Sequence, residues 1–273
     1  MRNGAQKIPK RSGLKPNRLD RTSVPPDISE RHDRVNHRLF VQDLNLETAS
    51  ADGSKNWLLW QLADSAFPAG GFAHSGGLEA ALQQGEIGSP GDLDSFIQTS
   101  LHQAGRAALP FVTEAFYEPQ QFSEIDQLND AFLSNHVANR ASRAQGQAML
   151  LAAERSFALP ALGELRSRVL AKKLPGHFAP VFGAVTCLLE VDHSSALRLY
   201  LFLVLRTLIA AAVRLGIIGP MDGQGLQSRL SPLAEQVLCQ CAELRALDAA
   251  QSAPLLEILH GAQDRLYSRL FQT

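Results

Sequence analysis

The sequence predicts an all-α fold: a single multi-helix bundle domain of about nine to ten helices, preceded by a disordered N-terminal extension. Nearly every segment after Trp57 repeats its apolar residues at three- and four-residue spacing, which is the period of an amphipathic helix. Runs that alternate β-branched and polar residues, the pattern of a half-buried strand, are missing. At 273 residues and 45% hydrophobic content, the chain is long enough to bury a substantial core.

The first 55 residues differ from the rest of the chain in charge and composition. They hold 11 Lys and Arg against 7 Asp and Glu and show no sustained apolar period, whereas the remainder holds 15 and 20. Low hydrophobicity with high charge predicts disorder. We therefore expect a disordered basic leader over residues 1–55 and an all-helical domain over residues 56–273. The mildly acidic body argues against binding to nucleic acid, whose usual footprint is a basic surface.

No stretch has the composition expected of a secretory signal or a membrane span. The strongest candidate span, residues 197–215, contains Arg198, Arg206 and Arg214, and we interpret it as a buried helix. Three cysteines are too few for a disulfide framework, which favours a reducing compartment. We expect a cytoplasmic protein that does not associate with membranes.

Start and stop signals place the helices of the first half of the chain. The apolar segments 57–63 and 78–84 flank a glycine-rich turn, and a glycine ends the second of them. Ser89 is a suitable N-cap and Pro90 a suitable first residue for the helix that follows, which Pro110 interrupts. The other helices expected in this half cover residues 123–137 and 140–157.

Proline, glycine and serine residues mark the helices of the second half. A Pro-Gly break separates the expected helices 162–172 and 178–190. Ser231 as N-cap and Pro232 as first residue predict a helix over residues 232–246. The other helices expected in this half cover residues 195–215 and 254–271.

The most unusual stretch is 62–79, Leu-Ala-Asp-Ser-Ala-Phe-Pro-Ala-Gly-Gly-Phe-Ala-His-Ser-Gly-Gly-Leu-Glu. Two glycine pairs, at positions 70–71 and 76–77, enclose His74 and Ser75. Glycine permits positive φ angles and the close approach of another backbone. We therefore expect a compact turn of specific shape between two helices, because a generic surface loop is more often polar throughout.

Two kinds of enzyme site can be compared with this stretch. Gly71 and Gly76 have the spacing of a phosphate-binding loop, but Gly77-Leu78 stands where Lys-Ser or Lys-Thr is required. Ala-His-Ser-Gly-Gly around Ser75 is one substitution from the Gly-x-Ser-x-Gly nucleophile elbow, yet the elbow needs a strand before the serine and the preceding segment is helical. A serine hydrolase that uses Ser75 is therefore the alternative hypothesis, and a helix cap is the favoured role of Ser75.

No residue pattern indicates a resident metal ion or cofactor. Cys239 and Cys241 stand two apart, and such positions on a helix point in different directions, so their sulfur atoms cannot reach one ion. His177, beside a Pro-Gly break, is interpreted as a structural residue or as a partner contact. Paired acids and bases and metal-ligand clusters are also missing. We therefore expect a protein that is not an enzyme.

One helix face is open to two interpretations, a solvated face or, second, a surface that binds another protein. Arg140, Arg143 and Gln147 stand three and four residues apart and therefore share a face. A solvated face is the ordinary interpretation, but this helix is otherwise rich in Ala and Gly, which allow another chain to approach closely. Farther along, Arg214 in the last turn of its helix suits the negative end of the helix dipole, which is a structural role.

Five stretches in order are more specific than any one of them. They are the stretch 62–79, Arg-Ala-Ser-Arg-Ala-Gln-Gly-Gln at 140–147, His-Phe-Ala-Pro-Val-Phe-Gly at 177–183, Arg-Leu-Gly-Ile-Ile-Gly-Pro-Met-Asp-Gly-Gln at 214–224 and Arg-Leu-Tyr-Ser-Arg-Leu-Phe at 265–271. Together they resemble the UreF family of urease accessory proteins. The resemblance covers about residues 57–273 and does not extend to the leader.

This resemblance implies an all-helical accessory protein, without a cofactor, that helps to insert nickel into apo-urease. In that family UreF forms a homodimer and bridges the accessory protein UreD (or UreH) and the GTPase UreG, which carries nickel and GTP. A role in modulating GTP hydrolysis by UreG is also implied. We expect partner-binding residues, and no bound metal, in the matching motifs. The candidates are His74, Ser75, Glu79, Arg140, Arg143, Gln147, His177, Arg214 and Gln224.

Overall fold

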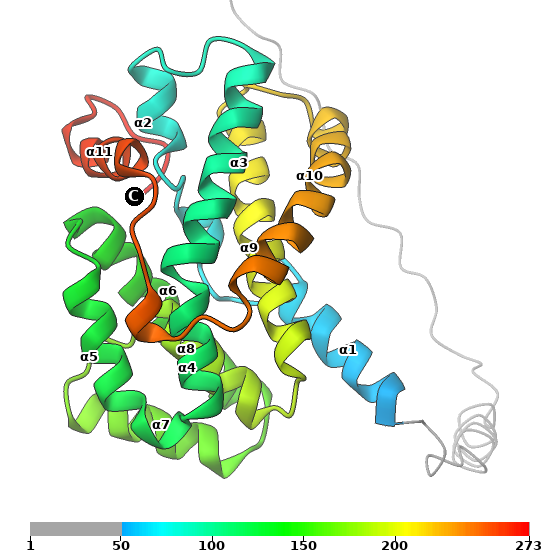
Figure 1. The fold of residues 1–273 in the computed structure, drawn as a ribbon, viewed down its shortest axis with the longest axis vertical. Helices are drawn as coiled ribbons and strands as arrows, with labels where there is room; N and C mark the ends of the chain where they lie inside the picture. The colour runs from blue at the N-terminus through cyan, green and yellow to red at the C-terminus, as the bar shows by residue number, and fades with distance from the viewer. Residues whose placement is uncertain (1–50, 273) are drawn as a thin grey trace, which may run out of the picture. The chain divides into compact units, whose positions relative to one another are not determined.

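The protein folds into helices joined by short connections throughout the residues that the structure describes, 51–272 (Figure 1). The structure is a computed structural model. The predicted all-α class is confirmed, because the described residues form α-helices and short 3-10 helices and none lies in a strand. The predicted leader lies outside the described residues as far as residue 50. The first helix begins at Ala51, earlier than the expected start at Trp57.

The α-helices are α1 (Ala51–Ala63), α2 (Leu78–Gln83), α3 (Pro90–Ala107), α4 (Leu109–Tyr117), α5 (Phe122–Phe132), α6 (His136–Ser156), α7 (Pro160–Ala171), α8 (Phe178–Leu188), α9 (His193–Arg214), α10 (Pro220–Cys241) and α11 (Pro254–Ala262). The 3-10 helices are η2 (Gly71–Ala73), η3 (Pro119–Gln121), η4 (Ala246–Asp248) and η5 (Gln263–Arg265). Every expected helical range overlaps one of these elements.

The predicted start of α3 is confirmed. Ser89 caps the helix, its Oγ accepting a hydrogen bond from the backbone N–H of Asp92 (3.3 Å), and Pro90 is the first helical residue. The helix ends at Ala107, ahead of Pro110. A separate short helix, α4, follows there, although the sequence did not predict it.

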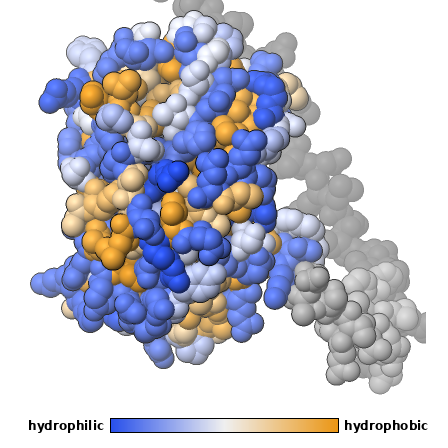
Figure 2. Space-filling model, in the orientation of Figure 1, coloured by the Kyte–Doolittle hydropathy of each residue, from blue (hydrophilic) through white to orange (hydrophobic). Residues whose placement is uncertain are grey.

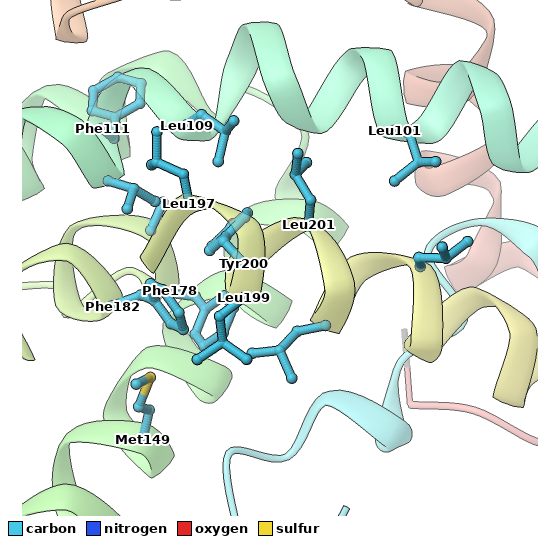
Figure 3. Packing of buried hydrophobic residues seen from close by; sticks show 14 of the residues in the cluster. Leu101, Leu109, Phe111, Met149, Phe178, Phe182, Leu197, Leu199, Tyr200 and Leu201 are labelled. Atoms are coloured by element: carbon cyan, nitrogen blue, oxygen red, sulfur yellow. The ribbon is translucent and has the colours of Figure 1, made fainter. Parts of the chain in front are cut away.

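Helix α9 is the central helix of the bundle and lies against α3, α4, α8 and α10. Figure 3 shows its buried side chains pointing to both sides. Leu197 and Leu201 point toward α3 and α4. On the other side Tyr200 packs against Phe178 and Phe182 of α8, with ring centroids 5.4 and 5.3 Å away. Such aromatic pairs add about 0.5–1.5 kcal/mol each beyond the burial of their area.

Helix α9 is also long and apolar enough to cross a membrane, the one such helix in the described part of the chain. Length and composition alone are weak evidence, because the core helix of a water-soluble protein passes the same test. In α9, 56% of the apolar window is buried by the rest of the fold. The sequence-based interpretation of this segment as a buried helix is consistent with that packing.

Helix α8 packs so closely against its neighbours that two glycines are required. A Cβ added at Gly183 of α8 would stand 2.2 Å from the carbonyl oxygen of Val112 in α4. A Cβ added at Gly146 of α6 would stand 2.1 Å from the carbonyl oxygen of Gly176, just before α8. Both distances are far below van der Waals contact, so a larger residue would force the backbones apart.

The predicted start of α10 at Pro232 is wrong. The helix begins at Pro220 and continues through Pro232 to Cys241. An earlier proline at the first helical position supplies the start. Ser231 does not cap a helix here, because its Oγ donates back to the carbonyl oxygen of Gln227 (2.8 Å) within α10.

The predicted C-terminal helix over residues 254–271 is also longer than the observed one. Helix α11 ends at Ala262, and after η5 the chain continues without regular structure over residues 266–272. We call residues 266–272 the tail. Contacts with residues distant in the sequence, described below, hold the tail in place of helical hydrogen bonds.

Candidate partner-binding surface

The glycine-rich stretch forms a compact turn between α1 and α2, as predicted. Gly70, Gly76 and Gly77 have φ angles of +73°, +63° and +86°, which other residues rarely adopt. Gly77 precedes α2, and a Cβ added there would stand 3.2 Å from the backbone nitrogen of His260 in α11. Glycine is therefore required at this position for its backbone conformation and for the close approach of α11.

Glu79 of α2 is buried, with 2% of its surface exposed, and it holds the tail. Its carboxylate accepts hydrogen bonds from Nε2 of Gln263 (2.7 Å) and from the backbone N–H groups of Leu270 (2.6 Å) and Phe271 (3.1 Å). Such donors replace the water that a carboxylate loses on burial. Glu79 therefore acts on the surface through the tail that it orders.

Arg214, at the end of α9, joins the same tail to the turn. Its Nη1 donates to the carbonyl oxygen of Phe72 (2.5 Å), and its guanidinium lies 4.3 Å from the centroid of the Phe271 ring. The backbone N–H of Gln272 donates to the carbonyl oxygen of Ala73 (2.9 Å). Residues 70–79 and the tail thus form one structure, which we call the turn–tail unit.

Apolar side chains of the turn–tail unit and of the adjacent helix α11 are exposed. Phe72 of the turn and Tyr267 and Leu270 of the tail are exposed, as are Leu255 and Ile258 of α11. Figure 2 shows apolar surface at the upper left, where α11 and α2 lie. Large apolar side chains exposed on an ordered backbone are typical of a protein-binding surface.

Ser75 faces the interior. It is fully buried, and its Oγ has no hydrogen-bond partner among the described residues. The predicted cap is wrong, because Gly77 precedes α2 and the positive φ angles of the turn leave the serine beneath it. The segment before Ser75 is a 3-10 helix and not a strand. The structure therefore gives the serine hydrolase alternative no support, since a buried serine is out of reach of a substrate.

An apolar cavity of about 530 Å³ lies between the turn, α6 and α9. Most of its lining surface is apolar, and its polar lining residues include His74, His260, Gln145 and Arg206. Burial lowers the pKa of each histidine to about 4, helped by the charge of Arg140 for His74 and by His74 for His260. Both imidazoles are therefore neutral near pH 7.

His177 is fully buried in a polar network between α5, α6 and α8. Its Nε2 lies 2.9 Å from Oδ1 of Asp130, and its Nδ1 lies 3.1 Å from Oγ of Ser142. The backbone N–H groups of Gly176 and His177 donate to the carboxylate of Asp126 at 2.8 and 2.7 Å. Burial raises the pKa of Asp126 and lowers that of His177. This geometry favours the structural interpretation of His177, because none of its surface is open to a partner.

Arg140, Arg143 and Gln147 lie on one face of α6 and are exposed. Arg140 forms a bidentate ion pair with Asp264 of η5, at 2.8 and 3.2 Å. Gln147 donates from Nε2 to the carbonyl oxygen of Pro175 (2.9 Å). Arg143 takes part in none of the ion pairs among the described residues.

Comparison with known proteins agrees with the motifs. The sequence matches the UreF family over residues 87–231, more than half of the chain. The chain belongs to the UreF family. The urease accessory protein F of Arabidopsis thaliana is 40% identical to it over 225 residues, which cover 81% of this chain and 94% of that protein.

Other relatives in the UreF family are similar over the same span. The urease accessory protein F of Oryza sativa subsp. indica is 38% identical over 229 residues, covering 82% of this chain and 88% of that protein. The UreF of Bacillus sp. (strain TB-90) is 33% identical over 226 residues, covering 79% and 97%. The resemblance inferred from the five stretches is thereby confirmed.

Some residues of this UreF-family chain that organise the site were missed at the sequence level. Gln263 and Asp264 lie in η5, where a continuous helix was expected, and Asp126 lies within an ordinary amphipathic helix. Conversely, Gln224 is exposed on α10, and no side-chain hydrogen bond ties it to the described residues. In the described part of the chain, no three His, Cys, Asp or Glu side chains gather to hold a metal ion.

Proposed function

We propose that this chain is a non-catalytic scaffold for urease maturation in the cytoplasm. As a homodimer it holds UreD (or UreH) and the nickel-carrying GTPase UreG together, so that nickel passes to apo-urease, and it modulates GTP hydrolysis by UreG. Membership of the UreF family supports the role in urease maturation. The partners come from the resemblance to that family, and two exposed surfaces support protein binding.

The turn–tail unit is the observation that carries this proposal. The buried carboxylate of Glu79 and the guanidinium of Arg214 fix the backbone, while the apolar side chains of Phe72 and Leu270 remain outside. A binding surface that is ordered before its partner arrives loses less conformational entropy on binding. We therefore assign the docking of one accessory partner to this unit.

The exposed tryptophans of α1 support the homodimer. Trp57 and Trp60 expose 71% and 60% of their surfaces, and their rings meet edge to face with centroids 5.1 Å apart. Phe202 of α9, the helix against which α1 packs, is also exposed. Each large aromatic side chain buries about 150–250 Å² when it is covered. We propose that α1 of one copy packs against α1 of a second copy.

Coexpression with UreD and UreG tests the scaffold, with masses determined by light scattering. We expect an assembly that contains two copies of this 29.7 kDa chain. Phe72→Asp combined with Leu270→Asp should remove at least one accessory partner and leave the dimer intact. Trp57→Asp combined with Trp60→Asp should leave a monomer.

Leu247→Asp is the matched control, because Leu247 of η4 is an exposed apolar residue of neither surface. This variant should change neither the mass of the assembly nor the partners that it contains. A wild-type chain that stays monomeric and binds neither UreD nor UreG would overturn the scaffold. Labelling of Ser75 by a serine-directed probe in the folded protein would contradict the assignment as a non-enzyme.

A further inference from the structure

A basic cleft at the start of α6 shares no lining residue with the α1 tryptophans or with the exposed apolar side chains of the turn–tail unit. Its volume is about 500 Å³, and we call it the α6 cleft. The end of α5, the connection to α6 and the first two turns of α6 form its walls. The lining residues are Leu133, Ser134, His136, Asn139, Arg140 and Arg143.

Positive groups outnumber the carboxylates that could neutralise them around this cleft. Asp264 is shared by Arg140 (2.8 Å), His136 (3.1 Å) and Arg269 (3.3 Å). Arg143 lies on the same face of α6 and has no carboxylate within ion-pair distance among the described residues. The cleft therefore contains an exposed guanidinium that forms no direct ion pair in the described fold, although its charge acts on Asp130 at longer range.

The second nearby carboxylate, Asp130, is already engaged. Its Oδ1 accepts a hydrogen bond from Nδ2 of Asn139 (2.9 Å) and lies 2.9 Å from Nε2 of His177. These contacts, first of all the hydrogen bond from Asn139, lower the pKa of Asp130, and the charge of Arg143 adds to this effect without an ion pair between the two side chains. The positive end of α6 is also occupied, because the Asn135 side chain accepts from the first N–H groups of the helix. The attraction of the cleft thus comes from its arginines.

We propose that the α6 cleft binds an acidic segment of one accessory partner, with Arg143 paired to an Asp or Glu of that segment. This inference rests on the proposed scaffold function. The planar guanidinium fork matches a carboxylate with two parallel hydrogen bonds, so arginine favours this partner over a simple polar contact. Residues 1–55 carry a net positive charge but include Asp43, Glu47 and Asp52 in a stretch without Lys or Arg, so a cross-link from position 143 to this chain's own leader would overturn the assignment.

A charge reversal measures the contribution of Arg143. The dissociation constants of UreD and of UreG are compared for the full-length wild type, Arg143→Glu and Arg155→Glu. Arg155 is the matched control, because it is exposed in the last turn of the same helix and forms no ion pair among the described residues. We expect Arg143→Glu to weaken one partner at least about tenfold, as truncation of an interfacial arginine does, and Arg155→Glu to weaken neither.

A chemical cross-link identifies the occupant. Arg143→Lys places an amine in the cleft, and a carbodiimide joins an amine to an adjacent carboxylate as an amide, taking up the lost water as a urea. In the complex with UreD and UreG, we expect mass spectrometry to find position 143 joined to an Asp or Glu of one partner. Arg155→Lys, treated in the same way, should give no such product.

Each outcome separates this inference from the scaffold itself. If the wild type assembles with its partners and Arg143→Glu does so with equal affinity, the cleft assignment is wrong and the scaffold stands. A cross-link only to a second copy of this chain, or only to Asp130 or Asp264, also overturns it. If Arg155→Glu weakens binding as much as Arg143→Glu does, the loss of affinity comes from the changed net charge of the chain and not from the α6 cleft. If the wild type binds neither partner, the scaffold itself fails.

Discussion

Two buried carboxylates, Asp126 and Glu79, each tie together segments that are far apart in the sequence, but they hold very different structures. The carboxylate of Asp126 accepts hydrogen bonds from the backbone N–H groups just before α8, a helix buried between α4 and α6. The carboxylate of Glu79 accepts hydrogen bonds from backbone N–H groups of the tail, which has no regular structure in the described residues. The same hydrogen bonding therefore stabilises the core in one region and a surface in the other.

The difference lies in what happens when the contact is lost. The start of α8 cannot separate from α6 without opening the core, because the backbones touch at Gly146. The tail can detach and regain hydrogen bonds to water. Changes near Asp126 should therefore lower the global free energy of unfolding, whereas changes near Glu79 should mainly lower the free energy of a local opening.

Gly146→Ala should give the largest effect, on the core side of this comparison. The added Cβ meets backbone atoms of residues 176–178 at 2.1–2.7 Å, and backbone cannot move aside as a flexible side chain can. We expect a loss of about 3 kcal/mol in the free energy of unfolding, measured by denaturant titration. Gly225→Ala on the exposed side of α10 is the control and should be neutral or stabilising by up to about 1 kcal/mol, since its nearest neighbour is 3.9 Å away. Equal effects of the two changes would contradict the close-packing argument.

The two histidines beside the turn, the buried His74 and the partly buried His260, should make the protein sensitive to acid. The folded pKa of His74 and of His260 is about 4, below the ordinary 6.5, so the folded state binds fewer protons than the unfolded state. Their contribution is present above pH 6.5 and is lost as the pH falls toward 4, with a slope of at most about 1.4 kcal/mol per pH unit for each. The raised pKa of Asp126 acts in the opposite direction, so variants must be compared with the wild type.

His260→Gln isolates the contribution of one histidine to the pH dependence of the unfolding free energy. The slope of the unfolding free energy between pH 6.5 and 4 should become shallower in this variant than in the wild type. Denaturant titrations at several pH values measure both slopes. An unchanged slope in His260→Gln would mean that this imidazole already takes up a proton in the folded state.

The sequence predicted the core side of the molecule better than the surface side. The position of α9 follows from an apolar period that is local to the segment, and the cap of α3 follows from Ser89 and Pro90. The tail could not be found in this way, because the partner of the Leu270 amide stands 191 positions away in α2. Pro232 misled the prediction because a proline at the start of a helix and one within it look alike in a local window.

In the candidate site too, the sequence predicted what depends on local pattern and not what depends on contacts distant in the chain. The helical period alone placed Arg140, Arg143 and Gln147 on one exposed face. The family motif located His74 and Ser75 in an important turn but did not reveal that they lie beneath it. Which motif residues face a partner depends on the path of the turn, and that path depends on long-range contacts.

Glu79→Gln tests the surface side directly. The change keeps the size of the side chain but removes the charge that three donors share, which should lower the global free energy of unfolding by only about 1–2 kcal/mol. Under native conditions, trypsin should cut after Arg265 and Arg269 faster in the Glu79→Gln variant than in the wild type. Glu86→Gln, an exposed residue beyond α2, is the control. If cleavage at both arginines keeps the wild-type rate, Glu79 is not what holds the tail.

Arg214→Lys should give the smallest effect and the most local one. Lysine keeps the positive charge near the carbonyl oxygen of Phe72 but lacks the planar group that lies over Phe271. The loss of that stacking, about 0.5–1 kcal/mol, should raise the hydrogen-exchange rates of the Phe271 and Gln272 amides about two- to fivefold. The global unfolding free energy should stay at the wild-type value, as it should in the control Arg155→Lys. A global loss would instead make Arg214 part of the core, and the turn–tail unit would then be an extension of the bundle that cannot open by itself.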